Sequence, residues 1–165
     1  MGLISQHARQ GILIDTNVLL VLLVGLVDQG LVGRFKRTES YTPEDFQLVL
    51  RLVQGFRRII TTPHILAELT NLSPTGREHR KAARYFGQLV AVLRRAYEHP
   101  VAKDVMLGSA LLPRIGFTDL SIIEAAKNGH YLVLTDDWRA SECARAQGCA
   151  VLNLNHLRGA AWLNG

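Results

Sequence analysis

Hydrophobic residues occur along this chain in short blocks separated by longer segments with helical spacing. The short apolar blocks predict buried strands at residues 11–15, 59–61, 131–135 and 150–154. The segments between them have apolar residues three or four positions apart, which predicts helices. Strands that alternate with helices are typical of a parallel sheet covered on both faces. The pattern therefore predicts an α/β fold.

Capping residues mark where several of these helices begin. Thr42-Pro43 and Thr62-Pro63 each place a hydroxyl before a proline, and a proline is well suited to the first helical position. Thr118-Asp119 is a similar start, and Gly129 is a typical stop. The predicted helices cover residues 18–28, 43 to about 54–56, 63–72, 76–98, 118–127 and 138–147. Residues 101–116 are expected to hold a helix followed by a Pro/Gly loop.

The longest apolar run covers residues 18–27, about half of the roughly 20 residues that span a bilayer. It is expected to be a core helix or a face for self-association as a homodimer. Asp15 and Asn17 interrupt the apolar stretch that a secretory signal would need. We therefore expect a cytoplasmic protein without a membrane-spanning segment.

The composition fits a single domain over residues 1–165, with a core at about 11–154. The chain has 165 residues, is 48% hydrophobic and carries a formal net charge of +5. A basic protein suits a polyanionic partner, but charge alone does not establish one. Cys143 and Cys149 lack zinc-knuckle spacing and are too few for a disulfide scaffold, so we expect buried, unreactive thiols.

Acidic residues recur where the predicted strands end and the helices begin. They are Asp15, Glu68, Asp119, Asp136 and Asp137. In open parallel sheets ligands bind outside the carboxyl ends of the strands, so these acids are expected at one edge. Any one of them could simply cap a helix or interact with a helix dipole. Together they would repel one another unless a cation such as Mg²⁺ or Mn²⁺ neutralised them.

The charge distribution agrees with such a site. The chain has 19 Lys and Arg against 14 Asp and Glu. Removing Asp15, Glu68, Asp119 and Asp137 from the 14 acids leaves 10, so the rest of the molecule is strongly basic. An acidic, metal-filled pocket in a basic surface suits a phosphodiester backbone, because phosphate contacts dominate nucleic-acid affinity.

Four segments resemble the four acidic motifs of PIN-domain nucleases, in their usual order. They are "ILIDTNVLL", "PHILAELTNL", "GFTDLSIIEAAKNG" and "YLVLTDDW". The resemblance implies a Rossmann-like three-layer α/β/α sandwich and a Mg²⁺- or Mn²⁺-dependent endoribonuclease. Two features depart from the compact toxins of this family: extra length at residues 34–45 and 99–116, and Trp138 close behind the fourth acid.

The resemblance also implies roles for particular residues. Asp15, Asp119 and Asp137 would centre on the metal, and Glu68 would complete the set of acids. Asn17 and Thr135 would orient ligands or the attacking water. The Thr-x-Asp pattern favours Asp137 as the fourth acid, and the adjacent Asp136 is an alternative that could contribute through water.

Other polar and aromatic residues are open to two interpretations. A cationic stripe on the helix at 76–98 either contacts RNA phosphates or is a solvated face; it consists of Arg77, Arg80, Lys81 and Arg84. His64 lies nearest the acidic edge and is expected to be an exposed first-turn residue without a special role. Trp138 and Trp162 are expected to pack rather than to stack on bases.

Three functional hypotheses follow. The leading one is an endoribonuclease that cuts RNA with a metal-bound water, as a housekeeping enzyme or as the toxin of a toxin–antitoxin pair with a small antitoxin partner. The second is a binding module that keeps the fold with an idle site. The third is another metal-assisted phosphoryl-transfer enzyme, such as a small phosphatase, although Asn17 stands where such an enzyme usually has a second Asp.

Overall fold

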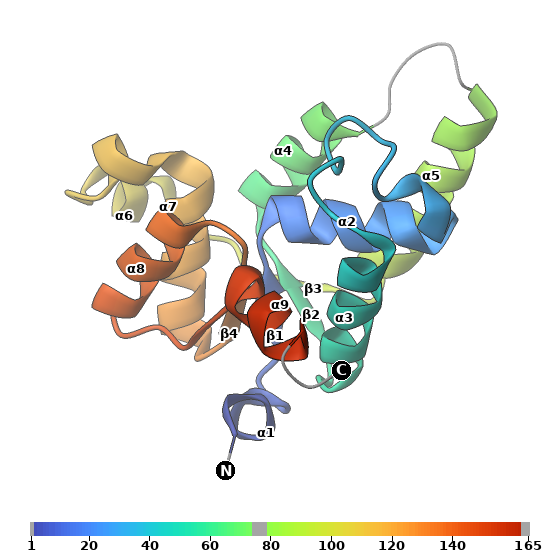
Figure 1. Ribbon diagram of the computed structural model, residues 1–165. Coiled ribbons are helices and arrows are strands. Elements are labelled where there is room, and N and C mark those ends of the chain that lie inside the picture. Colours follow the sequence, from blue (N-terminus) through green and yellow to red (C-terminus); the bar gives the residue numbers. More distant parts are fainter. Residues whose placement is uncertain (1, 74–78, 163–165) are drawn as a thin grey trace.

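The computed structural model describes residues 2–73 and 79–162 (Figure 1). In this part of the chain the strands form one five-stranded parallel sheet with the order β3-β2-β1-β4-β5. The central strand β1 (Ile12–Ile14) pairs with β2 (Ile59–Thr61) on one side and with β4 (Leu132–Thr135) on the other. The edges are β3 (Tyr97–Glu98) and β5 (Val151–Asn153). The predicted α/β fold with a parallel sheet is confirmed.

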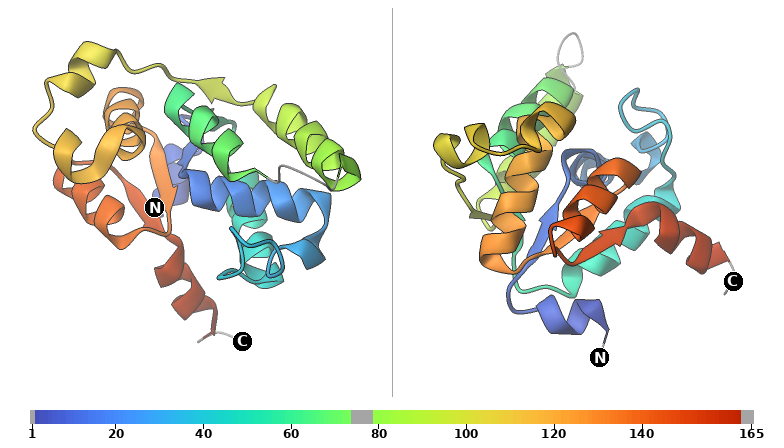
Figure 2. Two further views of the ribbon diagram at one scale, coloured as in Figure 1. Left: turned by 90° about the horizontal axis from the view of Figure 1, so that it is seen from above. Right: turned by 90° about the vertical axis from the view of Figure 1, so that its left-hand side faces the viewer.

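Helices cover both faces of the sheet and complete a three-layer sandwich. Figures 1 and 2 show one group of helices on one side and a second group on the other. The first group is α2 (Thr16–Val27), α3 (Pro43–Gln54), α4 (Pro63–Leu72) and α5 (His79–Leu93). The second group is α6 (Lys103–Leu107), α7 (Leu112–Gly129) and α8 (Trp138–Ala146). The strand order reverses between β1 and β4, which is the point where open α/β sheets bind ligands.

Helix α2 is the centre of the hydrophobic core. Ten of its twelve residues are buried, so it is apolar on every side. Gly25 allows α3 to pack closely against it, because a Cβ atom at this position would collide with the ring of Phe46. The helix is therefore a core element and presents no apolar face for self-association.

The predicted helix starts at residues 43 and 63 are confirmed by their caps. The Thr42 hydroxyl accepts a hydrogen bond from the Asp45 backbone N–H at 3.3 Å, and Asp45 accepts one from the Thr42 N–H at 2.8 Å. The Thr62 hydroxyl accepts a hydrogen bond from the Ile65 N–H at 3.3 Å. Each of these caps satisfies backbone N–H groups at the start of a helix that have no partner within the helix.

The predicted element boundaries are wrong in three places. The helix predicted at 76–98 ends at Leu93, and residues 97–98 form the edge strand β3, which is too short to create a strand pattern. Strand β5 ends at Asn153, and Leu154 begins α9 (Leu154–Trp162). The helix expected from residue 118 is the second part of α7, which begins at Leu112 and is kinked at Gly116, where φ is +75°.

Three helical segments in the described part of the chain were not predicted: α1 (Leu3–His7), the 3₁₀ turn η1 (Gln29–Leu31) and α9. Cys143 and Cys149 are both free, and each is partly rather than fully buried. Burial raises the pKa of the Cys149 thiol, which keeps it protonated at neutral pH. In the described part of the chain, no helix combines the length and apolarity needed to cross a bilayer.

Candidate functional site

Asp15 is a buried carboxylate at the end of the central strand. Its side chain is 7% exposed and does not cap α2, although it occupies the N-cap position. The Thr135 hydroxyl, at the end of the neighbouring strand β4, donates a hydrogen bond of 2.6 Å to its Oδ2 atom. Capping therefore does not explain why this position is acidic.

Burial raises the pKa of Asp15 to about 7, which is far above its ordinary value. The hydrogen bond from Thr135 partly offsets this effect. The negative charges of Asp119 and Asp136 raise the pKa further. Ionised Asp15 thus lies in an apolar surrounding with like charges as neighbours.

Asp119 belongs to the second part of α7, three residues after the kink at Gly116. Burial raises its pKa to about 6, and the charges of Asp137 and Glu68 contribute to the increase. Asp15, Asp119 and Thr135 line one pocket between α7 and α8, together with apolar residues such as Ile123 and Ala140. The structure therefore brings the predicted acids of β1 and α7 to the same place.

Glu68 reaches this edge through a residue that the sequence analysis did not single out. The Thr16 hydroxyl donates a hydrogen bond of 2.9 Å to Glu68 Oε2, so α4 is connected to the residue that follows Asp15. At the start of α4, the hydroxyl groups of Thr62 and Ser121 lie 2.9 Å apart and connect this helix to α7. Threonine is a common helix N-terminal residue, so the sequence offers no signal for the contact between Thr16 and Glu68.

The two adjacent acids after β4 have different surroundings. Asp137 is exposed and caps α8, since its Oδ1 atom accepts a hydrogen bond from the Ala140 N–H at 3.0 Å. Asp136 is half-buried and accepts a hydrogen bond from the Tyr41 hydroxyl. Asp137 raises the pKa of Asp119, whereas Asp136 raises that of Asp15. Both acids therefore face the site, and the capping explanation holds only for Asp137.

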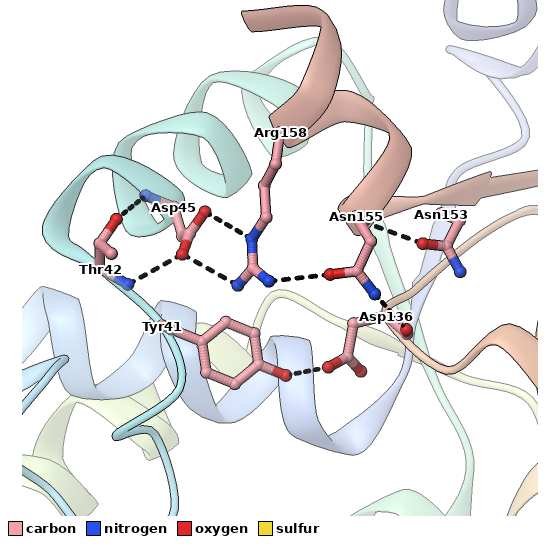
Figure 3. A network of polar contacts seen from close by, with 7 residues as sticks. All are labelled: Tyr41, Thr42, Asp45, Asp136, Asn153, Asn155 and Arg158. Carbon is pink, nitrogen blue, oxygen red and sulfur yellow. Dashed lines mark hydrogen bonds and ion pairs between the residues drawn. The ribbon is translucent and has the colours of Figure 1, made fainter. Parts of the chain in front are cut away.

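Asp136 is held by a polar network that joins three distant segments (Figure 3). Arg158 of α9 donates two hydrogen bonds to Asp45, at 2.7 and 2.9 Å, and its guanidinium lies 4.9 Å from the centre of the Tyr41 ring. Arg158 also donates to the Asn155 side chain at 2.8 Å, and Asn155 donates to the Asp136 backbone carbonyl at 2.7 Å. Burial and the Asp136 carboxylate raise the pKa of Tyr41, so its hydroxyl remains a donor.

Unsatisfied polar atoms also lie near this edge. Among the described residues, buried side-chain polar atoms without a hydrogen-bond partner are Asp136 Oδ1 and His64 Nδ1. Such atoms are rare in folded proteins and usually indicate a strained group or a missing water or ion. Asp136 Oδ1 belongs to one of the clustered acids, and His64 lies one helical turn before Glu68 on α4.

The remaining predicted residues are placed as follows. Asn17 is exposed, and its side chain makes no hydrogen bond within the described part of the chain. Arg77 lies outside the described residues, as do the side chains of Arg80 and Lys81. Arg84 donates a hydrogen bond of 3.1 Å to the Val27 carbonyl at the end of α2, which is a structural role.

The aromatic predictions have a mixed outcome. Trp138 is exposed, so the expectation that it packs is wrong. The Trp162 side chain lies outside the described part of the structure. His64 is only partly exposed, because its ring stacks against Phe117.

A divalent cation requires several oxygen donors that converge on one point. Among the described residues, no three His, Cys, Asp or Glu side chains are positioned to hold a metal ion as they stand. The acids do have the chemistry that Mg²⁺ and Mn²⁺ prefer, and no ion pair in the described ranges joins Asp15, Asp119 or Glu68 to a lysine or arginine. The acids therefore fit a cation in type and charge, but the described side chains are not arranged around a common metal position.

No protein-family model matches the sequence, and no curated protein matches it. Among solved structures, one similar chain is described as a domain of a functionally unknown protein from Methanocaldococcus jannaschii DSM 2661. The TM-score is 0.44 at 16% sequence identity, and the match covers 88% of this chain and 90% of that chain. The case for a function therefore rests on the residues of the site.

Proposed function

We propose that this protein is a Mg²⁺- or Mn²⁺-dependent endoribonuclease of the PIN type. The observation that carries the proposal is the convergence of Asp15, which is buried, and Asp119, which is half-buried; their pKa values are raised to about 7 and about 6. They line one pocket at the reversal point of the sheet. Strongly perturbed carboxylates in such a position are typical of functional sites.

The electrostatics of the pocket favours a cation over a purely structural role. Structural buried acids are normally compensated by a basic partner or by several hydrogen bonds. Asp15 has the Thr135 hydroxyl and the Thr16 backbone as partners, and its charged neighbours are two further acids. A divalent cation would neutralise these charges and lower both pKa values.

In this proposal some residues hold the metal, and others position the metal-binding carboxylates or the attacking water. Asp15 and Asp119 would hold the metal from β1 and α7, with Glu68 and either Asp136 or Asp137 completing the acidic set. Thr135 fixes one oxygen of Asp15, and Thr16 fixes one oxygen of Glu68. The bound metal supplies an activated water and stabilises the charge on the leaving oxygen of a phosphodiester. Asn17 would orient the attacking water from its exposed position.

RNA is the proposed substrate because the acids lie in a chain with a formal net charge of +5. The proposed setting is cytoplasmic, and a toxin role with a small antitoxin covering the acidic edge belongs to the same proposal. Release of such a partner would expose the site.

The test is cleavage of single-stranded RNA by the purified protein with Mg²⁺ or Mn²⁺ and with EDTA. We expect cleavage with metal, none with EDTA, and a loss of at least about 100-fold in Asp15→Asn and Asp119→Asn. The matched control is Asp104→Asn, which removes the same charge from an exposed position on α6. It should cleave like the wild type.

The alternatives give different outcomes. Undiminished cleavage by both Asp15→Asn and Asp119→Asn would overturn the proposal. RNA binding without cleavage and without Mn²⁺ binding, measured by calorimetry, would favour the binding module. Hydrolysis of a small phosphate monoester in preference to RNA would favour the phosphatase.

A further inference from the structure

Two large aromatic side chains are exposed on the helices that form the acidic pocket. Phe117 of α7 is 45% exposed, and Trp138 of α8 is 57% exposed. Phe117 directly follows the kink at Gly116 that begins the second part of α7, and Trp138 is the first residue of α8. Exposed aromatic rings beside a polar site often indicate a binding surface.

Phe117 has a defined orientation because another ring supports it. The rings of Phe117 and His64 are nearly parallel, with 8° between their planes and 6.1 Å between their centres. His64 comes from α4, one helical turn before Glu68, so the pair bridges two helices that carry acids. A ring supported on one face and exposed elsewhere can extend the stack with a further planar group.

Trp138 has a comparable arrangement on the other helix. His156 of α9 contacts it edge-to-face, with 5.5 Å between ring centres and 66° between planes. Trp138 directly follows Asp137, the acid that caps α8. Both exposed aromatic residues thus contact a histidine, and each comes from a helix that also carries an acid of the site or directly follows one.

Cationic side chains accompany both rings. Arg114 lies three residues before Phe117, Arg139 directly follows Trp138, and both are exposed. Aromatic rings combined with basic side chains are the usual means of binding single-stranded nucleic acid: the rings stack on bases, and the cations contact phosphates.

We propose that Phe117, supported by His64, and Trp138, supported by His156, are stacking platforms for two nucleobases of a single-stranded RNA that passes over the acidic edge of the sheet. Arg114 and Arg139 contact its phosphates. This inference rests on the proposed function for the class of ligand and adds the part of the ligand that is recognised. It also predicts that structured duplex RNA, whose bases are already stacked, is a poorer ligand.

The test measures binding of a short fluorescein-labelled oligouridylate in EDTA, so that no cleavage occurs. We expect Phe117→Ala and Trp138→Ala each to raise Kd about tenfold, which is within the range found for loss of one base–aromatic stack. Phe117→Tyr and Trp138→Phe keep a ring and should bind nearly like the wild type. The matched control is Val90→Ala, which truncates an exposed apolar residue on α5.

A second probe separates stacking from charge. An abasic oligonucleotide of the same length keeps the phosphates and lacks the bases, so the alanine variants should bind it like the wild type. Equal losses for both probes, or unchanged oligouridylate binding by both alanine variants, would overturn the inference. If binding depends on the rings but no metal-dependent cleavage occurs, the nuclease proposal is wrong and the stacking platforms remain. If RNA is cleaved but binding does not depend on the rings, the stacking platforms are wrong and the nuclease proposal remains.

Discussion

Asp15 and Asp45 are equally buried, at 7% exposure each, but their surroundings are opposite. Asp45 receives two hydrogen bonds from Arg158 and one from the Thr42 N–H. Asp15 is stabilised by the Thr135 hydroxyl and the Thr16 backbone, has no basic partner, and faces the like charges of Asp119 and Asp136. The same chain therefore compensates one buried carboxylate with an arginine and leaves the other with acids as its charged neighbours.

The comparison distinguishes a carboxylate whose charge stabilises the fold, Asp45, from one whose charge destabilises it, Asp15. Asp45 holds α3 and α9 together, so its charge contributes to stability. Asp15 has a pKa raised to about 7, so its ionisation opposes folding. Burial alone does not distinguish the two roles, whereas the sign of the neighbouring charges does.

The largest expected effect is the removal of the cation that compensates Asp45. Arg158→Ala leaves this carboxylate buried without its partner and should lower the free energy of unfolding by about 3 kcal/mol. The control is Arg145→Ala, which breaks the exposed ion pair with Glu142 and should cost less than about 1 kcal/mol. Urea denaturation measures both. Equal costs would mean that the Arg158 pair is no more than a surface contact.

The opposite sign is expected at Asp15. Asp15→Asn removes a charge that burial and two acids disfavour, so in EDTA at pH 8 it should raise the free energy of unfolding by about 1–2 kcal/mol. Asp104→Asn, which neutralises an exposed acid, is the control and should change it by less than about 0.5 kcal/mol. A destabilised Asp15→Asn protein would contradict the proposed repulsion.

The same reasoning gives a pH dependence. The folded-state pKa of Asp15 lies above the unfolded value, so its favourable contribution is complete at low pH and is lost as the pH rises to about 7. The advantage of Asp15→Asn over the wild type should therefore vanish near pH 4 and reach its maximum above pH 7. Thermal melts in EDTA across this range measure it, and an advantage independent of pH would rule out titration of Asp15 as the cause.

The smallest effect on stability is expected at Tyr41, which lies between the surroundings of Asp45 and those of Asp15 and contacts both Arg158 and Asp136. Tyr41→Phe keeps the ring beside Arg158 and removes the hydrogen bond to Asp136, so stability should fall by about 1 kcal/mol. Tyr85→Phe removes a buried contact with Ser73 remote from the acids and is the control. RNA cleavage should decrease in Tyr41→Phe and remain unchanged in Tyr85→Phe. Equal cleavage by the two variants would show that Asp136 needs no positioning.

Local signals in the sequence were enough for four of the five described strands and for the helices that begin at Pro43 and Pro63. Thr42-Pro43 and Thr62-Pro63 cap N–H groups within four residues, so the cap and the helix start that it stabilises can be recognised from one short segment of sequence. The acids at strand ends were also predictable, because parallel strands bring their carboxyl ends to one edge. Asp15 was found in this way and Asp119 as an acid at a predicted helix start, and the two do line one pocket.

Contacts between distant residues were not predictable from local patterns. Arg158 and Asp45 are 113 positions apart, and Tyr41 and Asp136 are 95 apart. The sequence around each of these residues therefore does not indicate its partner. The different surroundings of Asp136 and Asp137 have the same origin, since Tyr41 reaches only the first of them. Strand β3 was missed because two residues form no recognisable alternation.

The pairing of β1 with β4 also determines when the acidic edge can form during synthesis. Asp15 and Thr135 are 120 positions apart, so the central strand leaves the ribosome long before its neighbour exists. At translation rates of about 5–20 residues per second, this delay is about 6–24 s. Asp15 gains its hydrogen-bond partner and its acidic neighbours only near the end of that interval. Until then the nascent chain contains Asp15 but not the other residues of the acidic edge that surround it.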